Sequence, residues 1–134
     1  MIKKYIGTII ISSRIDRESF IKTLKEIEDK YKEFGGIPIM HSSTDCANGL
    51  IDLSYIVGVC KSINYDNLEV EFEIIENTPS SRLLSNMIEE YYSDKDIIYL
   101  DLYPRMISSE KKNDINIISN ITGFNTVFLT MRGK

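Results

Sequence analysis

The side chains best suited to chemistry cluster around a single histidine. His41 is the only histidine of the chain, and it is followed closely by Ser42, Ser43 and Asp45. It ends a short strand-like segment, and the ends of strands often present catalytic side chains to a loop. A lone histidine in such a place more often has a structural role at the surface or at the edge of the core. His41 is therefore a candidate that needs partner groups.

The two cysteines, Cys46 and Cys60, do not supply those partners convincingly. A thiolate beside an imidazole is an activated nucleophile, but neither cysteine lies in a recognisable spacing signature relative to His41. A zinc site is equally unsupported, because the three residues show no paired close spacing. We expect two free thiols in a reducing compartment, no metal and no cofactor.

An acidic row is the other conspicuous cluster. Glu69, Glu71 and Glu73 alternate with Val70, Phe72 and Ile74. A period of two with one apolar set is typical of a strand that has one solvated face. We therefore interpret the row as a solvent-exposed strand face, not as a metal or acid-base cluster.

Composition and charge limit the class of protein. The 134 residues are 43% hydrophobic and 27% charged, which predicts one folded domain over residues 1–134. A net charge of -4, without a basic stripe, argues against nucleic-acid binding. No run of 18 apolar residues occurs, and the N-terminal stretch Met1–Ser13 suits a strand better than a signal peptide. The sequence thus predicts a soluble cytosolic protein that does not bind membranes.

The first half of the chain predicts a strand, a long helix and a second strand. Tyr5–Ser12 is a short isoleucine-rich segment. Asp16 is a suitable N-cap for a helix over Arg17–Phe34, which Gly35 and Gly36 would end. The apolar stripe of this helix is Phe20, Ile21, Leu24, Ile27, Tyr31 and Phe34. A short strand over Ile37–His41 and a polar loop over Ser42–Gly49 follow.

The second half predicts a hairpin, a second helix and further strands. The turn dipeptide at 66–67 joins arms over Ser54–Asn64 and Leu68–Glu76. Thr78 and Pro79 open a helix that ends near Tyr92. We expect its buried stripe to be Leu83, Leu84, Met87, Ile88 and Tyr91. The remaining segments are a strand over Ile97–Met106, a polar turn over Ser108–Asn113 and one bent strand or two short ones over Ile115–Met131, with the bend at Thr122 and Gly123.

This element order predicts an α+β fold in which a mostly antiparallel sheet or barrel carries two flanking helices. Three segments also resemble a known family. In the tailed-phage prohead (capsid maturation) serine proteases, a helix is followed by a histidine-bearing strand, and Arg14–Leu24 followed by Gly36–His41 is similar to this pair. Ile51–Gly58 is similar to the family's Asp-anchored strand that starts a hairpin, and Leu68–Leu84 is similar to its strand-to-helix junction. The resemblance covers about residues 14 to 128 and implies the fold of that family.

The resemblance fails at the positions that would carry catalysis. Tyr103 and Pro104 stand where the family has its nucleophilic serine motif, and only Arg105 of that motif is kept. Asn125 stands at the acidic position that supports the histidine, and a neutral amide cannot stabilise an imidazolium as a carboxylate does. The resemblance therefore implies a pseudo-protease in which His41 is a relic.

These observations lead us to expect a virion structural protein. It would be an auxiliary or head-associated capsid protein, made in the host cytoplasm and located in the phage head. Its partners would be the major capsid protein or other head components. Aromatics such as Tyr91, Tyr92 and Tyr103 are candidate contacts, and the alternative that they cover the edge of the core is favoured. Two alternatives remain. The chain would be an active maturation protease if Ser108 or Ser109 served His41 as nucleophile, or it would be an unrelated small protein-binding module.

Overall fold

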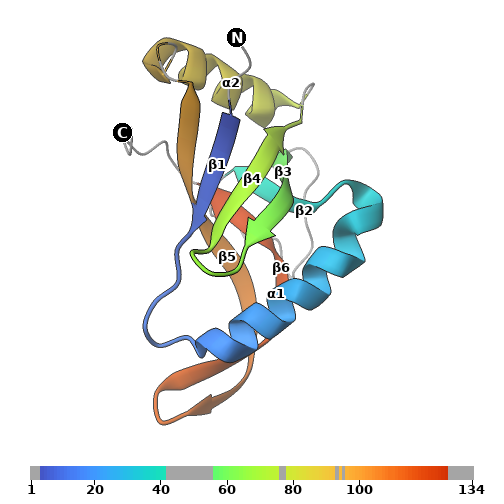
Figure 1. Cartoon of the computed structure of the whole chain (residues 1–134), viewed down its shortest axis with the longest axis vertical. Coiled ribbons are helices and arrows are strands. Elements are labelled where there is room, and N and C mark those ends of the chain that lie inside the picture. Colours follow the sequence, from blue (N-terminus) through green and yellow to red (C-terminus); the bar gives the residue numbers. More distant parts are fainter. Residues whose placement is uncertain (1–3, 42–55, 76–77, 93, 95, 127–134) are drawn as a thin grey trace.

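Six strands close into one barrel in the computed structural model, which describes residues 4–41, 56–75, 78–92, 94 and 96–126 (Figure 1). Around the barrel the order of the strands is β1-β4-β3-β2-β6-β5. Their bounds are β1 (Lys4–Ile9), β2 (Ile37–His41), β3 (Ile56–Asn64), β4 (Glu69–Ile74), β5 (Ile97–Lys112) and β6 (Ile115–Thr126).

The pairing of the strands is mixed. β1 with β4, β2 with β3, β3 with β4 and β5 with β6 are antiparallel, whereas β1 with β5 and β2 with β6 are parallel. The predicted α+β class with a barrel and two helices is confirmed, but a mostly antiparallel sheet is only partly correct. Turn signals in a sequence indicate hairpins, which are antiparallel. Both parallel pairs join strands that are distant in the chain, so no local signal predicts them.

The first helix, α1 (Arg17–Tyr31), begins as the sequence predicts. The Ser19 N–H donates to the Asp16 carboxylate at 2.9 Å, so Asp16 is the N-cap. The helix tightens into a 3-10 turn, η1 (Lys32–Phe34), and ends at left-handed Gly35 (φ 92°). The prediction that Phe34 is buried is wrong, because its side chain is 74% exposed. In the tightened last turn its ring packs edge-on against Tyr31 instead.

The second helix, α2 (Pro79–Tyr92), also has the predicted start and end. Thr78 caps it by accepting the Ser81 N–H at 3.0 Å. The predicted stripe is partly wrong, since Leu83 and Tyr91 are 50% and 61% exposed, whereas Tyr92 is only 5% exposed. Two neighbouring apolar stripes have helical spacing here, and contact with β3 selects the one that passes through Leu84 and Ile88.

The hairpin of β3 and β4 confirms the predicted turn. The Leu68 N–H donates to the Asn64 carbonyl at 2.8 Å, and Leu68 takes a positive φ of 57°. On β4, Val70 and Phe72 are buried while Glu71 and Glu73 are exposed. This hairpin lies in the same sheet as β5, as the sequence predicts.

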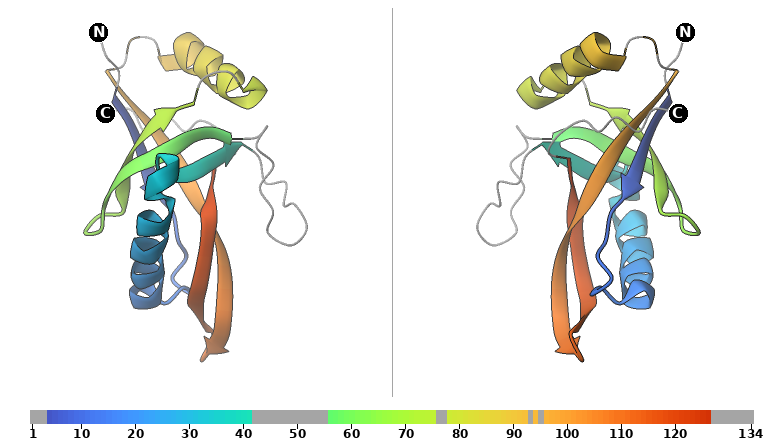
Figure 2. Two further views of the ribbon diagram at one scale, coloured as in Figure 1. Left: turned by 90° about the vertical axis from the view of Figure 1, so that its right-hand side faces the viewer. Right: turned by 90° about the vertical axis from the view of Figure 1, so that its left-hand side faces the viewer.

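The ribbon of β5 and β6 differs from the prediction. β5 continues through the predicted Ser108–Asn113 turn to Lys112, and the chain reverses at Asn113 and Asp114. Both of these residues have positive φ, as a two-residue hairpin loop of type I′ requires. The ribbon projects beyond the barrel (Figures 1 and 2), and its tip over residues 108–114 is polar and exposed like a loop. Residues 127–131 of the predicted strand lie outside the described residues.

The core is the barrel interior together with the inner face of each helix. Its fully buried side chains include Phe20, Phe124, Leu24, Ile37, Ile39, Ile88, Ile98, Leu100, Leu102 and Ile121. The helices lie toward opposite ends of the molecule (Figure 2), with α1 beside β6 and α2 against β3. Neither of these two helices has the length and hydrophobicity needed to cross a lipid bilayer.

Candidate functional site

The candidate histidine ends strand β2. Along the parallel pair of β2 and β6, Met40 lies opposite Asn125 and His41 opposite Thr126. Only the backbone of His41 is described. Ser42, Ser43, Asp45 and Cys46, which follow it, lie outside the described residues.

The three other positions singled out from the sequence, Tyr103, Pro104 and Asn125, lie on the neighbouring strands β5 and β6. Tyr103 of β5 is the Cα partner of Asn125 on β6, and Asn125 in turn is opposite Met40 on β2. Tyr103 is 36% exposed, and both Pro104 and Asn125 are half-buried. The barrel therefore brings the backbone positions 41, 103 and 125 onto three adjacent strands, although they are far apart in the sequence.

Arg105 is held against this same group of strands. Its Nη1 donates to the Met40 sulfur at 3.3 Å, and its Cα partner on β6 is Gly123. Gly123 has a φ of +140°, and a Cβ there would meet the Pro38 carbonyl oxygen at 2.9 Å. Glycine is thus needed at 123 for β6 to pass so close to β2.

Sequence reasoning missed one acidic residue in this region. Asp101 lies two residues before Tyr103 on β5 and is only 7% exposed. The available signal was an acid within the apolar run Ile97–Leu102, a setting in which a carboxylate is costly unless it has partners. Asp101 does have an interaction in the structure, so its burial is supported.

The two alternative nucleophiles lie far from the histidine along the ribbon. Ser108 is opposite Ile118, and the Ser109 hydroxyl donates to the Ile117 carbonyl at 3.4 Å. His41 is opposite Thr126, which is 126 − 118 = 8 positions farther along β6. At about 3.3 Å per residue this corresponds to roughly 25 Å, well beyond hydrogen-bonding reach.

The described cysteine is not poised for reaction. Cys60 is a free, buried thiol, and burial followed by the nearby Glu28 carboxylate raises its pKa far above the usual value. The reactive thiolate is therefore disfavoured. Among the residues that the structure describes, no three histidine, cysteine or acidic side chains are grouped closely enough to hold a metal ion.

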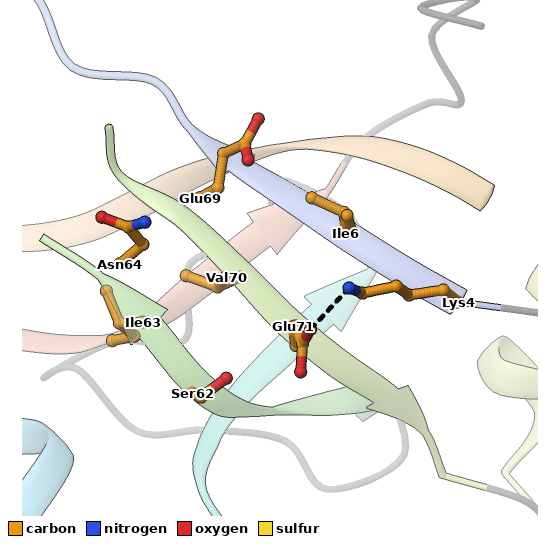
Figure 3. A pocket seen from close by; sticks show the side chains of 8 residues that line it. All are labelled: Lys4, Ile6, Ser62, Ile63, Asn64, Glu69, Val70 and Glu71. Atoms are coloured by element: carbon orange, nitrogen blue, oxygen red, sulfur yellow. Dashed lines mark ion pairs between the residues drawn. The ribbon is translucent and has the colours of Figure 1, made fainter. Parts of the chain in front are cut away.

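The acidic row of β4 lies on the outer surface, where Glu69 and Glu71 line a groove of about 230 Å³ (Figure 3). Glu71 pairs with Lys4 of β1 at 2.9 Å, and Glu73 pairs with Lys61 of β3 at 3.8 Å. The bond from Glu71 raises the pKa of the Lys4 ammonium. The interpretation of this row as a solvated strand face is confirmed, with cations from both flanking strands beside it.

A larger groove, of about 450 Å³, lies between the C-terminal end of α1 and strand β3. Glu28, Asp29 and Lys32 line it from the helix side, and Cys60–Ile63 line it from the strand. Near this groove the Tyr65 hydroxyl donates to the Glu28 carboxylate at 2.6 Å, and the Lys25 ammonium lies 5.0 Å from the centre of the Tyr65 ring. Burial and then the bond to Glu28 raise the pKa of Tyr65. Sequence reasoning did not predict this groove, because no residue in it forms a motif.

Comparison of the chain with protein-family models, with curated protein sequences and with solved structures finds no match.

Proposed function

We propose that this chain is a head-associated structural protein of a tailed phage, built on a prohead-protease-like barrel that does not cleave peptide bonds. The observation that carries the proposal is the alignment of three strands. Positions 41, 103 and 125, which resemble the catalytic positions of that family, lie on the adjacent strands β2, β5 and β6. A chance resemblance in sequence would not require the three positions to be neighbours.

The residues at these positions support the absence of peptidase activity. A serine protease needs a hydroxyl within about 2.6 to 3.2 Å of the histidine nitrogen and a third group that orients the histidine. Pro104 has no hydroxyl, and the Tyr103 phenol is a bulky and weak nucleophile. Asn125 offers an amide where a carboxylate would stabilise the imidazolium.

The position of the alternative serines also favours an inactive protein. Ser108 and Ser109 lie on the projecting ribbon, roughly 25 Å along β6 from the position opposite His41. An active protease that used either serine would need the ribbon to refold. With catalysis set aside, the role left for a virion protein of this fold is binding to another head protein, consistent with its net charge of -4.

The proposal is tested in the phage that encodes the chain. We expect quantitative mass spectrometry of purified mature particles to find the protein in stoichiometric amounts relative to the major capsid protein. The variant His41→Ala should leave both its incorporation and the cleavage of other head proteins unchanged. Ser119→Ala, at an exposed position on β6 of the ribbon, is the matched control.

Two results would contradict the proposal. Absence of the protein from mature particles would exclude a structural role, and loss of capsid-protein cleavage in His41→Ala but not in Ser119→Ala would show that the site is catalytic.

A further inference from the structure

The groove between α1 and β3 exposes the edge of a strand. β2 pairs with β3 only as far as Cys60, where its partner is Ile37. β4 continues to pair with the other edge of β3 as far as Asn64. Residues 62–64 of β3 are therefore paired on one side only within the described part of the chain. Lys61 lies at the irregularity in the β3–β4 register, and Lys61–Ile63 line the groove.

Two glycines explain why this edge stays open. Gly35 and Gly36 have φ values of +92° and +135°, and they turn the chain sharply from α1 into β2. A Cβ on Gly36 would collide with the Cys60 carbonyl oxygen, so glycine lets the chain turn tightly against β3 at this point. β2 thus begins opposite Cys60, and the space beyond it along β3 is the groove.

The open edge presents backbone groups to the groove. In an antiparallel pair, successive residues direct their N–H and C=O groups to alternate sides of the strand. The Asn64 carbonyl accepts the Leu68 N–H, so Asn64 is directed toward β4. The N–H and C=O of the preceding residue, Ile63, are therefore directed toward the groove, where an added strand would bond to them.

Charges give the groove a direction. Lys32 follows α1 directly, and the Lys61 ammonium lies 3.8 Å from where a Cβ of Gly35 would be, so both cations are at the Gly35 end. Glu28 is bonded to Tyr65, at the opposite end, with Asp29 beside it in the sequence. An extended peptide that runs antiparallel to β3 would place its C-terminal side at the lysines and its N-terminal side at the carboxylates.

We propose that this groove binds an extended segment of a partner protein as an added strand, antiparallel to β3, with a basic residue toward its N-terminal side and an acidic residue toward its C-terminal side. Strand addition at an exposed edge is an established mode of peptide recognition. A volume of about 450 Å³ is within the usual range of ligand sites. The inference rests on the proposed function insofar as that function requires a protein partner.

Peptide binding to the purified chain tests the groove directly. The probe is the synthetic peptide acetyl-Lys-Val-Thr-Val-Asp-amide, and the control is the charge-reversed acetyl-Asp-Val-Thr-Val-Lys-amide. We expect the first peptide to give saturable ¹H–¹⁵N shift changes at the amides of Lys61 to Ile63, with a dissociation constant of about 1 mM, and the second to bind about fivefold more weakly. Equal binding of the two peptides, shift changes confined to other strands, or no shift change at about 5 mM peptide would overturn the proposal.

A charge-swapped variant provides the second measurement. Asp29→Lys combined with Lys32→Glu keeps the net charge and leaves one charge of each sign at both ends of the groove, so it should abolish the preference between the two peptides. Lys22→Glu, at an exposed position on the same helix, should leave the preference unchanged. A preference that persists undiminished in this variant, or a groove that is instead filled by a second copy in a concentration-dependent dimer, would overturn the assignment.

These results are separable from the proposed function. If the protein binds the peptide but is absent from particles, the virion role is rejected and the proposed peptide-binding groove is retained. If the protein is incorporated stoichiometrically but binds neither peptide, the virion role is retained and peptide binding in the groove is rejected.

Discussion

The two helices begin with the same local signals and reach different degrees of integration with the barrel. α1 is fixed by its side chains: Phe20 and Leu24 are fully buried, and the Thr23 hydroxyl donates to the Ile118 carbonyl at 3.1 Å. The Ser19 hydroxyl in turn accepts the Ile118 N–H at 3.1 Å. α1 is thus tied to β6 by both apolar packing and hydrogen bonds.

α2 is attached mainly to β3, and two of its buried residues are serines. Ser80 and Ser81 are among its buried residues, while Leu83 and Tyr91 remain exposed on the adjacent stripe. Its main tether is Thr78, whose hydroxyl donates to the Ile56 carbonyl at 2.8 Å. The difference teaches that a cap and an apolar period define a helix, whereas the partner surface determines which stripe is buried and how firmly.

The largest effect should come from the core of α1. Phe20→Ala removes a fully buried ring that contributes to the barrel core, and we expect it to lower the free energy of unfolding by about 3–5 kcal/mol. Leu83→Ala on the exposed stripe of α2 should change it by less than about 0.5 kcal/mol. Urea denaturation of the two variants measures both values. Similar losses of unfolding free energy in the two variants would mean that Leu83 is packed against the barrel as firmly as Phe20, and that the two helices do not differ in this respect.

Removing the N-cap side chains should lower the free energy of unfolding by less than Phe20→Ala does. Here the larger loss should come from α2. Asp16→Ala removes an N-cap bond to Ser19 and should cost about 1 kcal/mol. Thr78→Ala removes an N-cap bond and also the bond to Ile56, so it should cost about 2 kcal/mol. Thermal and urea denaturation of both variants give the values. A Thr78→Ala loss no larger than that of Asp16→Ala would show that the tether to β3 adds nothing.

The smallest effect concerns Tyr65, whose hydroxyl ties the hairpin to α1. Tyr65→Phe should lower the free energy of unfolding by about 1 kcal/mol at neutral pH. Because burial and the bond to Glu28 raise the folded pKa of Tyr65 above 10.0, this stabilisation is complete below pH 10 and is lost as the pH rises through the folded pKa.

The difference between wild type and Tyr65→Phe should therefore shrink above pH 10, which urea denaturation at a series of pH values would measure. Tyr91→Phe, on the exposed stripe of α2, is the matched control and should stay close to wild type. A constant difference across this range would mean that the Tyr65 hydroxyl does not titrate against Glu28.

Much of the secondary structure was predictable because its signals are local. Asp16, Thr78 and the left-handed Gly35 set helix ends through bonds and backbone angles within a few residues. The end of β5 was not predictable, because the exposed ribbon has the polar composition of a loop. Only pairing with β6 identifies residues 107–112 as a strand.

For the candidate site, the sequence by itself determined the residue types: one histidine at the end of a strand, tyrosine and proline at 103 and 104, and asparagine at 125. The tertiary structure alone decided that these positions share adjacent strands and that Ser108 and Ser109 do not join them. The tertiary structure also determined that one edge of β3 is unpaired beyond Cys60, because Gly35 and Gly36 turn the chain sharply and β2 begins only at Ile37. Strand neighbours across a closed barrel depend on closure of the whole sheet, and no short window of sequence encodes that closure.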